Sequence, residues 1–366
     1  MTAVPVIIEV AVPSPLYRSF DYKLPDTTSV PAPGTRVLVP FGRQRLVGIV
    51  LGHKAHSDLA GNKLKAVQEV LDPQPVFDTG LLQLMNWAAR YYHHPIGETL
   101  ATALPVLLRK TGKPANTTLH HWQLTELGHA QSTTDLQRAA RQVQVLEILQ
   151  AQPQGLPRDA LPVPLSVLKA LEDKGWIECF VASPQQRAPV ITTAESAPAL
   201  TTQQELAVQK VLSGSDRFTP YLLDGVTGSG KTEVYLQLIA PQLAAAKQVL
   251  VLVPEIGLTP QLVDRFQQRF GLTIPVLHSA LNDTERLQAW QQAAGGSAPL
   301  VLGTRSAVFT PLKNPGLIIV DEEHDASLKQ QDGLRYSARD LAVWRARQLD
   351  IPVILGSATP SLESLY

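Results

Sequence analysis

A glycine-rich segment ending in lysine and threonine is the strongest chemical signal in the sequence. It fits the pattern G-x-x-x-x-G-K-[ST] at every position: Gly225, Val226, Thr227, Gly228, Ser229, Gly230, Lys231 and Thr232. Backbone N–H groups of such a loop can surround a β-phosphate, and the helix that follows adds the positive end of its dipole. Lys231 is expected to reach the β- and γ-phosphate oxygens, and Thr232 to bind Mg²⁺. The segment therefore predicts an ATP site rather than a chance glycine-rich turn.

An acidic run supplies the second part of an ATPase site. Residues 321–324 are Asp-Glu-Glu-His and directly follow the apolar residues 317–320. A buried parallel strand would place them at its carboxyl end, where open α/β sheets bind ligands. We expect Asp321 to bind Mg²⁺ and Glu322 to orient and deprotonate the attacking water, while Lys231 carries phosphate charge. A solvated acidic loop would explain this run alone, but the phosphate loop upstream favours catalysis.

Two loops rich in small and hydroxyl residues follow other apolar runs. They are residues 303–307 (Gly-Thr-Arg-Ser-Ala) and residues 356–360 (Gly-Ser-Ala-Thr-Pro). Small side chains, hydroxyls and Arg305 suit close approach to a phosphate backbone or to a neighbouring motif. Each loop alone is an ordinary turn, but their shared position at strand ends favours a functional role.

The elements that must position these residues alternate along residues 200–366. The expected strands are 221–223, 249–253, 275–277, 300–302, 317–320 and 353–355, and the expected helices include 260–270, 283–294 and 338–348. Short continuous apolar runs are typical of parallel strands buried on both faces. The pattern predicts an open, doubly wound α/β sheet.

Residues 1–112 predict a small β-barrel-like domain with an appended helix. β-Branched and apolar runs at 6–12, 36–42 and 46–51 indicate short paired strands. The helix is indicated by helical spacing of six apolar residues: Leu81, Leu82, Leu84, Met85, Ala88 and Ala89.

Residues 115–182 predict a winged-helix domain, with a small helical linker domain as the alternative. Residues 136–149 keep helical spacing behind a possible cap at Thr134-Asp135, and a second helix ends at Gly175 before an apolar strand and hairpin. Residues 183–199, rich in Pro, Ala, Ser, Thr and Gln, predict a linker. The chain is therefore predicted to be an α/β multidomain protein.

Composition excludes several classes of protein. The chain has 366 residues with 32 Lys+Arg against 32 Asp+Glu, so its net charge of zero excludes a bulk polycation that coats nucleic acid. A single cysteine, Cys179, excludes an internal disulfide or a cysteine-cluster metal site within the chain. No apolar run approaches a membrane span, and Pro5 and Glu9 interrupt the N-terminal run, so we expect neither a membrane segment nor a signal peptide.

Five segments resemble, in chain order, motifs I, Ia, Ib, II and III of superfamily 2 helicases. They are residues 225–232, 253–261, 303–307, 321–324 and 356–360. The specific amino acids of the chain resemble those of the bacterial replication-restart helicases in three segments: residues 225–235, 278–283 and 321–325. Three further segments are similar to the N-terminal DNA-binding domain of that family: residues 20–22, 39–42 and 91–97. The resemblance covers nearly the whole chain and is loosest over residues 115–182.

The resemblance implies roles for individual residues. It makes Gln204 the residue that recognises adenine, and it makes His324, Ser357 and Thr359 the group that couples nucleotide state to DNA. It places the 3′ end of a nascent leading strand against Phe20, Asp21, Gly42 and Lys65. An aromatic ring can stack on a terminal base, and a carboxylate can accept a hydrogen bond from a free 3′-hydroxyl. The structural alternatives are a barrel core residue for Phe20 and a turn residue for Asp21.

The loop at residues 327–336, after the acidic run, resembles the segment that senses single-stranded DNA in this family. The family has aromatic residues where this chain has Leu328 and Leu334, which leaves Tyr336 to stack on bases. Candidate phosphate contacts are Lys329, Arg335 and, from the earlier loop, Arg305. We therefore expect weaker base sensing here than in the family.

The sequence ends at Tyr366, just after motif III. The resemblance makes residues 200–366 a RecA-like, ATP-binding first lobe. It also implies a second RecA-like lobe with motifs IV to VI, whose arginine completes hydrolysis, and a zinc-binding cysteine cluster, neither within this sequence. We therefore expect this polypeptide alone to bind ATP weakly and to hydrolyse it poorly. The resemblance also implies forked and single-stranded DNA, single-stranded-DNA-binding protein and primosome proteins as partners, without a membrane. It further implies a cytoplasmic, nucleoid-associated location in bacteria.

The leading functional hypothesis is an ATP-dependent 3′-to-5′ DNA helicase that recognises stalled or abandoned replication forks and initiates primosome assembly. A non-catalytic fork-binding fragment is the second hypothesis, but intact Lys231 and Glu322 favour the enzyme. A generic superfamily 2 translocase or RNA helicase is the third, and residues 20–22 argue against it. A P-loop kinase is disfavoured because Asp-Glu-Glu-His would have no role there.

Overall fold

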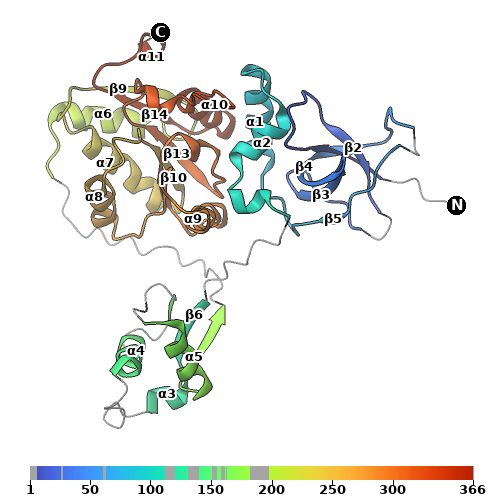
Figure 1. Cartoon of the computed structure of the whole chain (residues 1–366). Coiled ribbons are helices and arrows are strands. Elements are labelled where there is room, and N and C mark those ends of the chain that lie inside the picture. The colour runs from blue at the N-terminus through green and yellow to red at the C-terminus, as the bar shows by residue number, and fades with distance from the viewer. Residues whose placement is uncertain are drawn as a thin grey trace. The chain divides into compact units, whose positions relative to one another are not determined.

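Figure 1 shows the chain as a computed structural model that describes residues 6–25, 28–60, 63–111, 120–130, 140–150, 155–157, 161, 163–181 and 198–365. The chain divides into two compact units. The first comprises Met1–Pro114 and Arg187–Tyr366, and the second comprises Ala115–Gln186. Most of the predicted linker, and the predicted cap at Thr134-Asp135, lie outside the described residues.

The N-terminal part of the first unit is a five-stranded antiparallel sheet with the order β2-β1-β4-β3-β5. Its strands are β1 (Ile7–Ala11), β2 (Phe20–Lys23), β3 (Arg36–Phe41), β4 (Gln44–Lys54) and β5 (Glu69–Val70). The sheet curls until its two edges meet: Lys23 N donates to Lys65 O at 2.9 Å, and Val67 N donates to Lys23 O at 3.0 Å. Alternate side chains such as Ile8, Val10 and Val50 fill the interior. The predicted barrel is confirmed.

The helix predicted after this barrel is α1 (Thr79–Tyr91), followed by α2 (Ile96–Ala103) and the 3₁₀ turn η1 (Val106–Arg109). Asp78 begins α1 by accepting a hydrogen bond from Leu81 N at 2.7 Å. The six residues of the predicted apolar face are all buried. The helix prediction is therefore confirmed.

The C-terminal part of the first unit is a six-stranded parallel sheet with the order β11-β12-β10-β13-β14-β9. Its strands are β9 (Pro220–Asp224), β10 (Gln248–Leu252), β11 (Val276–Leu277), β12 (Leu300–Gly303), β13 (Pro315–Val320) and β14 (Val353–Ser357). All six predicted strands are present. The predicted RecA-like, doubly wound α/β lobe is confirmed.

Helices cover both faces of this sheet because its strands are apolar on both sides. Along β10, Leu250 and Leu252 enter one core, and Val249 and Val251 enter the other. The helices are α6 (Thr202–Leu212), α7 (Lys231–Ala244), α8 (Pro260–Phe270), α9 (Asp283–Gly295), α10 (Ala338–Leu349) and α11 (Leu362–Leu365), with 3₁₀ turns η4 (Arg305–Phe309) and η5 (Ala326–Leu328). The three helices predicted in this region are confirmed.

The barrel with its helices and the helicase-like lobe share one core within the first unit. Figure 1 shows α1 and α2 beside the lobe, and the apolar cluster that contains Leu84 of α1 also contains Leu341 of α10. Trp87 of α1 stacks on Trp344 of α10, with ring centroids 5.4 Å apart. Gln348 Nε2 donates to Gly80 O at 3.0 Å. The apolar face of α1 therefore joins two parts that the sequence analysis treated as separate domains.

The second unit combines helices with a three-stranded antiparallel sheet of order β7-β6-β8. Its elements among the described residues are β6 (His120–Leu124), α3 (Glu126–Ala130), α4 (Ala140–Gln150), β7 (Leu156–Pro157), α5 (Leu165–Asp173) and β8 (Ile177–Val181). Gly175, at φ +69°, ends the second predicted helix as expected. Strand β8 pairs with β6, from the start of the unit. The second strand of the predicted hairpin would follow residue 181 and lies outside the described residues, so the winged-helix interpretation stays a prediction.

Within the described part of the chain, no helix is both long enough and apolar enough to cross a lipid bilayer.

Candidate ATP site and DNA contacts

The glycine-rich loop connects β9 to α7 at the carboxyl edge of the parallel sheet. Gly228 and Gly230 have φ angles of +82° and +84°, a region that residues with a Cβ rarely adopt. A Cβ on Gly230 would also lie 2.4 Å from Nε2 of Gln204. These glycines let the loop turn tightly before α7 begins at Lys231. The N-terminus of α7 is thereby available for an anion.

Lys231 connects this loop to the acidic run. Its Nζ donates to Gly225 O at 2.9 Å and lies 3.4 Å from Glu322 Oε1, and its side chain is only 9% exposed. Glu322 follows β13, two strands away from β9, and has a φ of +44°. The sheet thus brings together the two predicted catalytic residues that lie furthest apart in the sequence.

Asp321 lies against α7 through a partner that the sequence analysis did not identify. Tyr235 donates its hydroxyl to Asp321 Oδ1 at 2.8 Å. Burial raises the pKa of Asp321 against the opposing effect of this hydrogen bond, and the neighbouring Glu322 carboxylate adds to the rise. Tyr235 is one helical turn after Lys231 and so lies on the same face of the helix. This spacing is the feature of the sequence that could have identified Tyr235 as a residue of the site.

Gly356 makes the contact between Tyr235 and Asp321 possible. A Cβ at this position would lie 1.6 Å from the Tyr235 hydroxyl and 3.4 Å from Asp321 Oδ1. The acidic side chain can therefore face the first turn of α7, where Thr232 carries its hydroxyl. A carboxylate and a hydroxyl beside a phosphate loop are a donor set that suits Mg²⁺. The predicted Mg²⁺ ligands, Thr232 and Asp321, fit that role.

We expect Gly356→Ala to destabilise the lobe by about 1–3 kcal/mol, because the added methyl must displace Tyr235 from a packed interior. Thermal denaturation of the chain measures this change. Gly295→Ala is the matched control, because no atom lies within 4 Å of a Cβ there, and we expect almost no effect. Equal melting temperatures for the two variants would contradict this account.

The predicted coupling residues are in contact. His324 Nδ1 lies 2.7 Å from Ser357 Oγ, and Thr359 N donates to the same oxygen at 3.1 Å. Ser357 is fully buried, and its carbonyl accepts a hydrogen bond from Gly225 N at 3.0 Å. The loop after β14 therefore contacts both the acidic run and the phosphate loop. That placement suits relay between them, although the coupling itself stays a prediction.

Glu323 is a buried anchor that the sequence analysis assigned no role. It accepts hydrogen bonds from Ser361 N at 2.7 Å, Ser364 Oγ at 2.8 Å and Arg339 at 3.1 Å. Burial alone would raise the pKa of Glu323, but these hydrogen bonds outweigh burial and lower it. The carboxylate therefore stays ionised and ties the acidic run to α10 and to the segment after β14.

Gln204 contacts the phosphate loop directly. Its Nε2 donates to Ser229 O at 2.8 Å, and its Oε1 accepts from Thr201 N at 2.9 Å in a capping box that begins α6. The predicted adenine-recognising residue thus lies beside the nucleotide loop, while recognition of adenine stays a prediction.

The four candidate residues for the DNA 3′ end lie on β2 or close to it. Phe20 and Asp21 lie on the strand itself, and the Phe20 ring packs edge-on against Phe41, which precedes Gly42, with centroids 5.0 Å apart. Lys65 bonds to the end of β2 through its carbonyl, and its side chain is exposed. Phe20 is partly buried against the barrel core, so it has both a packing role and an accessible surface.

Asp21 lies on a strand rather than in a turn, and two donors hold its carboxylate. Lys54 Nζ donates to Asp21 Oδ1 at 2.9 Å, and Ser57 Oγ donates to Oδ2 at 2.7 Å. Burial alone would raise the pKa of Asp21, but the bonds from Lys54 and Ser57 outweigh burial and lower it below the ordinary value of 3.8. The carboxylate is therefore an ionised acceptor at neutral pH.

The structure corrects the prediction that Tyr336 stacks on bases. Its side chain is 1% exposed and packs edge-on against Phe309, with ring centroids 4.8 Å apart. Leu328 and Leu334 are buried in the same cluster, because the loop folds back and pairs Lys329 with Ser337. The apolar side chains of this loop therefore stabilise the lobe and present no ring to DNA.

The charged candidates near this loop differ in exposure. Lys329 and Arg335 are exposed, as a phosphate contact requires. Arg305 is partly buried, and its NH1 donates to Ser327 O at 3.1 Å. Arg305 thus connects η4 to the loop after the acidic run, and any DNA contact from it stays a prediction.

Two family models match the chain. Residues 9–105 match the PriA 3′ DNA-binding domain, and residues 201–366 match the DEAD/DEAH box helicase family, which implies the use of nucleotide and Mg²⁺. The replication restart protein PriA of Haemophilus influenzae is 46% identical over 98% of this chain and 50% of that protein. Both matched parts of the chain are thus similar to PriA proteins.

Further PriA proteins show the same similarity. PriA of Bacillus subtilis is 33% identical over 98% of this chain and 53% of that protein, and PriA of Chlamydia pneumoniae is 36% identical over 97% and 49%. The chain therefore spans about half the length of these PriA proteins. Among solved structures, RecG bound to a three-way DNA junction is 26% identical over 46% of this chain and 22% of that chain, with a TM-score of 0.35.

Proposed function

We propose that this chain provides the DNA-binding domains and the first ATPase lobe of an ATP-dependent DNA helicase that restarts replication at stalled or abandoned forks. One observation carries the proposal: Lys231 and Glu322 meet 3.4 Å apart at the carboxyl edge of the sheet. This pairing of a phosphate-binding lysine with a water-activating carboxylate occurs in a chain whose first domain matches a 3′ DNA-binding domain.

ATP hydrolysis is the chemistry that this sheet edge supports. Thr232 and Asp321 would hold Mg²⁺, which when bound would neutralise phosphate charge. Lys231 would exchange its contact with the Gly225 carbonyl for a phosphate oxygen, a stronger partner. Glu322, which also lies 3.7 Å from His324, would then be free to orient and deprotonate water.

The barrel is proposed to hold the 3′ end of a leading strand beside β2. Asp21 uses one oxygen for Lys54 and the other for Ser57, but an ionised carboxylate has further lone pairs. A terminal 3′-hydroxyl can donate to one of these lone pairs. A terminal 3′-phosphate instead brings negative charge against negative charge. Asp21 would therefore select for an extendable DNA end.

The proposal extends to the fork-level activity of the family. It includes 3′-to-5′ movement, forked and single-stranded DNA as substrates, and single-stranded-DNA-binding protein and primosome proteins as partners. It also includes a cytoplasmic, nucleoid-associated location. Similarity to PriA proteins supports these parts of the proposal.

We expect the chain to bind a model fork more tightly when its leading-strand arm ends in a 3′-hydroxyl than in a 3′-phosphate. Loss of a charge-assisted hydrogen bond, worth about 1.5–3 kcal/mol, predicts a roughly 10- to 150-fold difference in affinity. Asp21→Asn should remove most of this preference. Fluorescence anisotropy at fixed salt measures it, because phosphate contacts make affinity depend on salt.

Glu69→Gln is the matched control, because it removes an exposed carboxylate from β5 of the same barrel. It should keep the preference for a 3′-hydroxyl. Since the pKa of Asp21 lies below 3.8, Asp21 stays ionised from pH 5 to 8, so its hydrogen bond to the 3′-hydroxyl should persist over this range. Equal binding to both forks would contradict the 3′-end site. It would favour a general superfamily 2 translocase whose N-terminal barrel binds DNA without selecting the chemistry of its end.

A further inference from the structure

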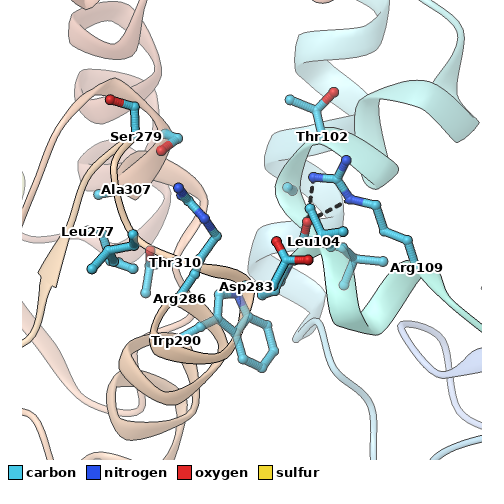
Figure 2. A pocket seen from close by; sticks show the side chains of 15 residues that line it. Thr102, Leu104, Arg109, Leu277, Ser279, Asp283, Arg286, Trp290, Ala307 and Thr310 are labelled. Atoms are coloured by element: carbon cyan, nitrogen blue, oxygen red, sulfur yellow. Dashed lines mark hydrogen bonds between the residues drawn. The ribbon is translucent and has the colours of Figure 1, made fainter. Parts of the chain in front are cut away.

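A cavity of about 350 Å³ lies within the first unit, where the segment from α2 to η1 faces the lobe. One wall comes from the region of Thr102 and Leu104, and the other from α9 and the residues after β11 and β12. Figure 2 shows Arg109 and Arg286 extending from opposite walls. Neither residue belongs to a motif that the ATP site or the 3′-end site uses.

The two arginines leave positive charge in the cavity. Arg109 donates from Nε and NH2 to Leu104 O at 2.9 and 2.7 Å, and Arg286 donates from NH2 to His278 O at 2.8 Å. These carbonyl acceptors are neutral, and each guanidinium carries further N–H donors. The carboxylate of Asp283 lines the same cavity, but its Oδ2 lies 3.7 Å from Lys110, which offsets its charge.

The repulsion between these arginines shows in the pKa of Arg109. Burial lowers the pKa of Arg109, and the charge on Arg286 lowers it further, with Asp283 opposing. An anion between the two guanidinium groups would relieve this repulsion.

A buried donor without a partner points to a ligand independently. Trp290 lines the cavity and is 8% exposed, and its Nε1 has no hydrogen-bond partner among the described residues. A buried indole N–H normally finds an acceptor. An anionic oxygen in the cavity would supply one. The hydroxyls of Ser279 and Thr102 lie around the same space.

The position in the fold favours a nucleic-acid phosphate. Ser306 and Ala307, from the loop after β12, also line the cavity, which places it at the carboxyl edge of the sheet. Arg109 follows the domain matched as a 3′ DNA-binding domain by only a few residues. We propose that Arg109, Arg286 and Trp290 bind a backbone phosphate of single-stranded DNA between α2–η1 and the lobe. The inference rests on the proposed DNA-helicase function, and it gives the α2–η1 segment a place on the strand's path.

The test uses the 366-residue chain and a fluorescein-labelled oligothymidylate that ends in a 3′-phosphate, so that preference for a 3′-hydroxyl plays no part. Anisotropy is followed at several salt concentrations. We expect Arg286→Gln to weaken binding about tenfold and to lower the salt slope by about 0.7, the value for one lost phosphate contact on a single strand. Arg109→Gln should behave alike.

Ser279→Asp tests the same cavity without removing a described hydrogen bond, because it only adds negative charge to an exposed position. It should weaken binding as well, and Trp290→Phe should weaken it while keeping an aromatic ring. Arg347→Gln is the control, because this exposed residue lies at the end of α10, near the opposite edge of the sheet. It should leave both affinity and salt slope unchanged.

Unchanged affinity and slope in both Arg286→Gln and Ser279→Asp would overturn the inference, even if the 3′-hydroxyl preference holds. Titration with inorganic phosphate and thymidine 5′-monophosphate distinguishes a free anion from DNA. Binding of either small anion that is lost in Arg286→Gln, with DNA affinity unaffected, would also overturn it. Weaker DNA binding in these variants, without the effect in Arg347→Gln, supports it.

Discussion

Lys231→Ala is expected to lower the affinity of the chain for ATP by roughly 10- to 150-fold. The Nζ lies at the start of α7, and its present partners are the Gly225 carbonyl and the Glu322 carboxylate. A bound phosphate would gain a charge-assisted hydrogen bond from this amine, and such a bond contributes about 1.5–3 kcal/mol. Titration with a fluorescent ATP analogue in the presence of Mg²⁺ measures the change.

Lys210→Ala is the control for this measurement, because Lys210 is an exposed lysine of α6 on the same lobe. It should bind the nucleotide as the unaltered chain does. The melting temperatures of both variants, taken without nucleotide, separate lost binding from lost folding. Equal ATP affinity in Lys231→Ala and the unaltered chain would show that the glycine-rich loop does not hold the triphosphate.

Arg36→Leu is expected to destabilise the N-terminal barrel by about 3–5 kcal/mol, the cost of leaving one partner of a buried ion pair unmatched. The Arg36 side chain is 1% exposed, and its NH2 lies 2.6 Å from Asp72 Oδ1. Its NH1 donates to Leu108 O at 2.7 Å. The residue therefore connects β3 to η1, which in turn faces the lobe.

Hydrogen exchange of the β3 and β4 amides measures this loss, because a chain with two compact units need not unfold in one step. The double variant with Arg36→Leu and Asp72→Leu should regain much of the stability, since no buried charge is then left alone. Arg45→Leu, at an exposed position of β4, should change protection by less than about 0.5 kcal/mol. Similar losses of amide protection in Arg36→Leu and Arg45→Leu would show that the buried ion pair of Arg36 does not stabilise the barrel.

The sequence by itself determined the helicase-like lobe in considerable detail. Its strands are short apolar runs, and its helices begin at recognisable caps such as Thr259 and Asn282, so local pattern suffices to place them. The glycine-rich loop and the acidic run were found for the same reason, since each depends on residues next to one another in the chain. Parallel strands then required both segments to meet at one edge.

Only the tertiary structure decided which side chains are accessible and which partners they have. Tyr336 has the polarity and ring of a base-stacking residue, but the loop folds it against Phe309 in the core. The anchoring of Asp21 by Lys54 and Ser57 joins residues more than thirty positions apart. Arg109 and Arg286 face one cavity because α2–η1 packs beside α9. Burial and pairing of this kind depend on which elements pack together, and local spacing along the chain carries no record of that choice.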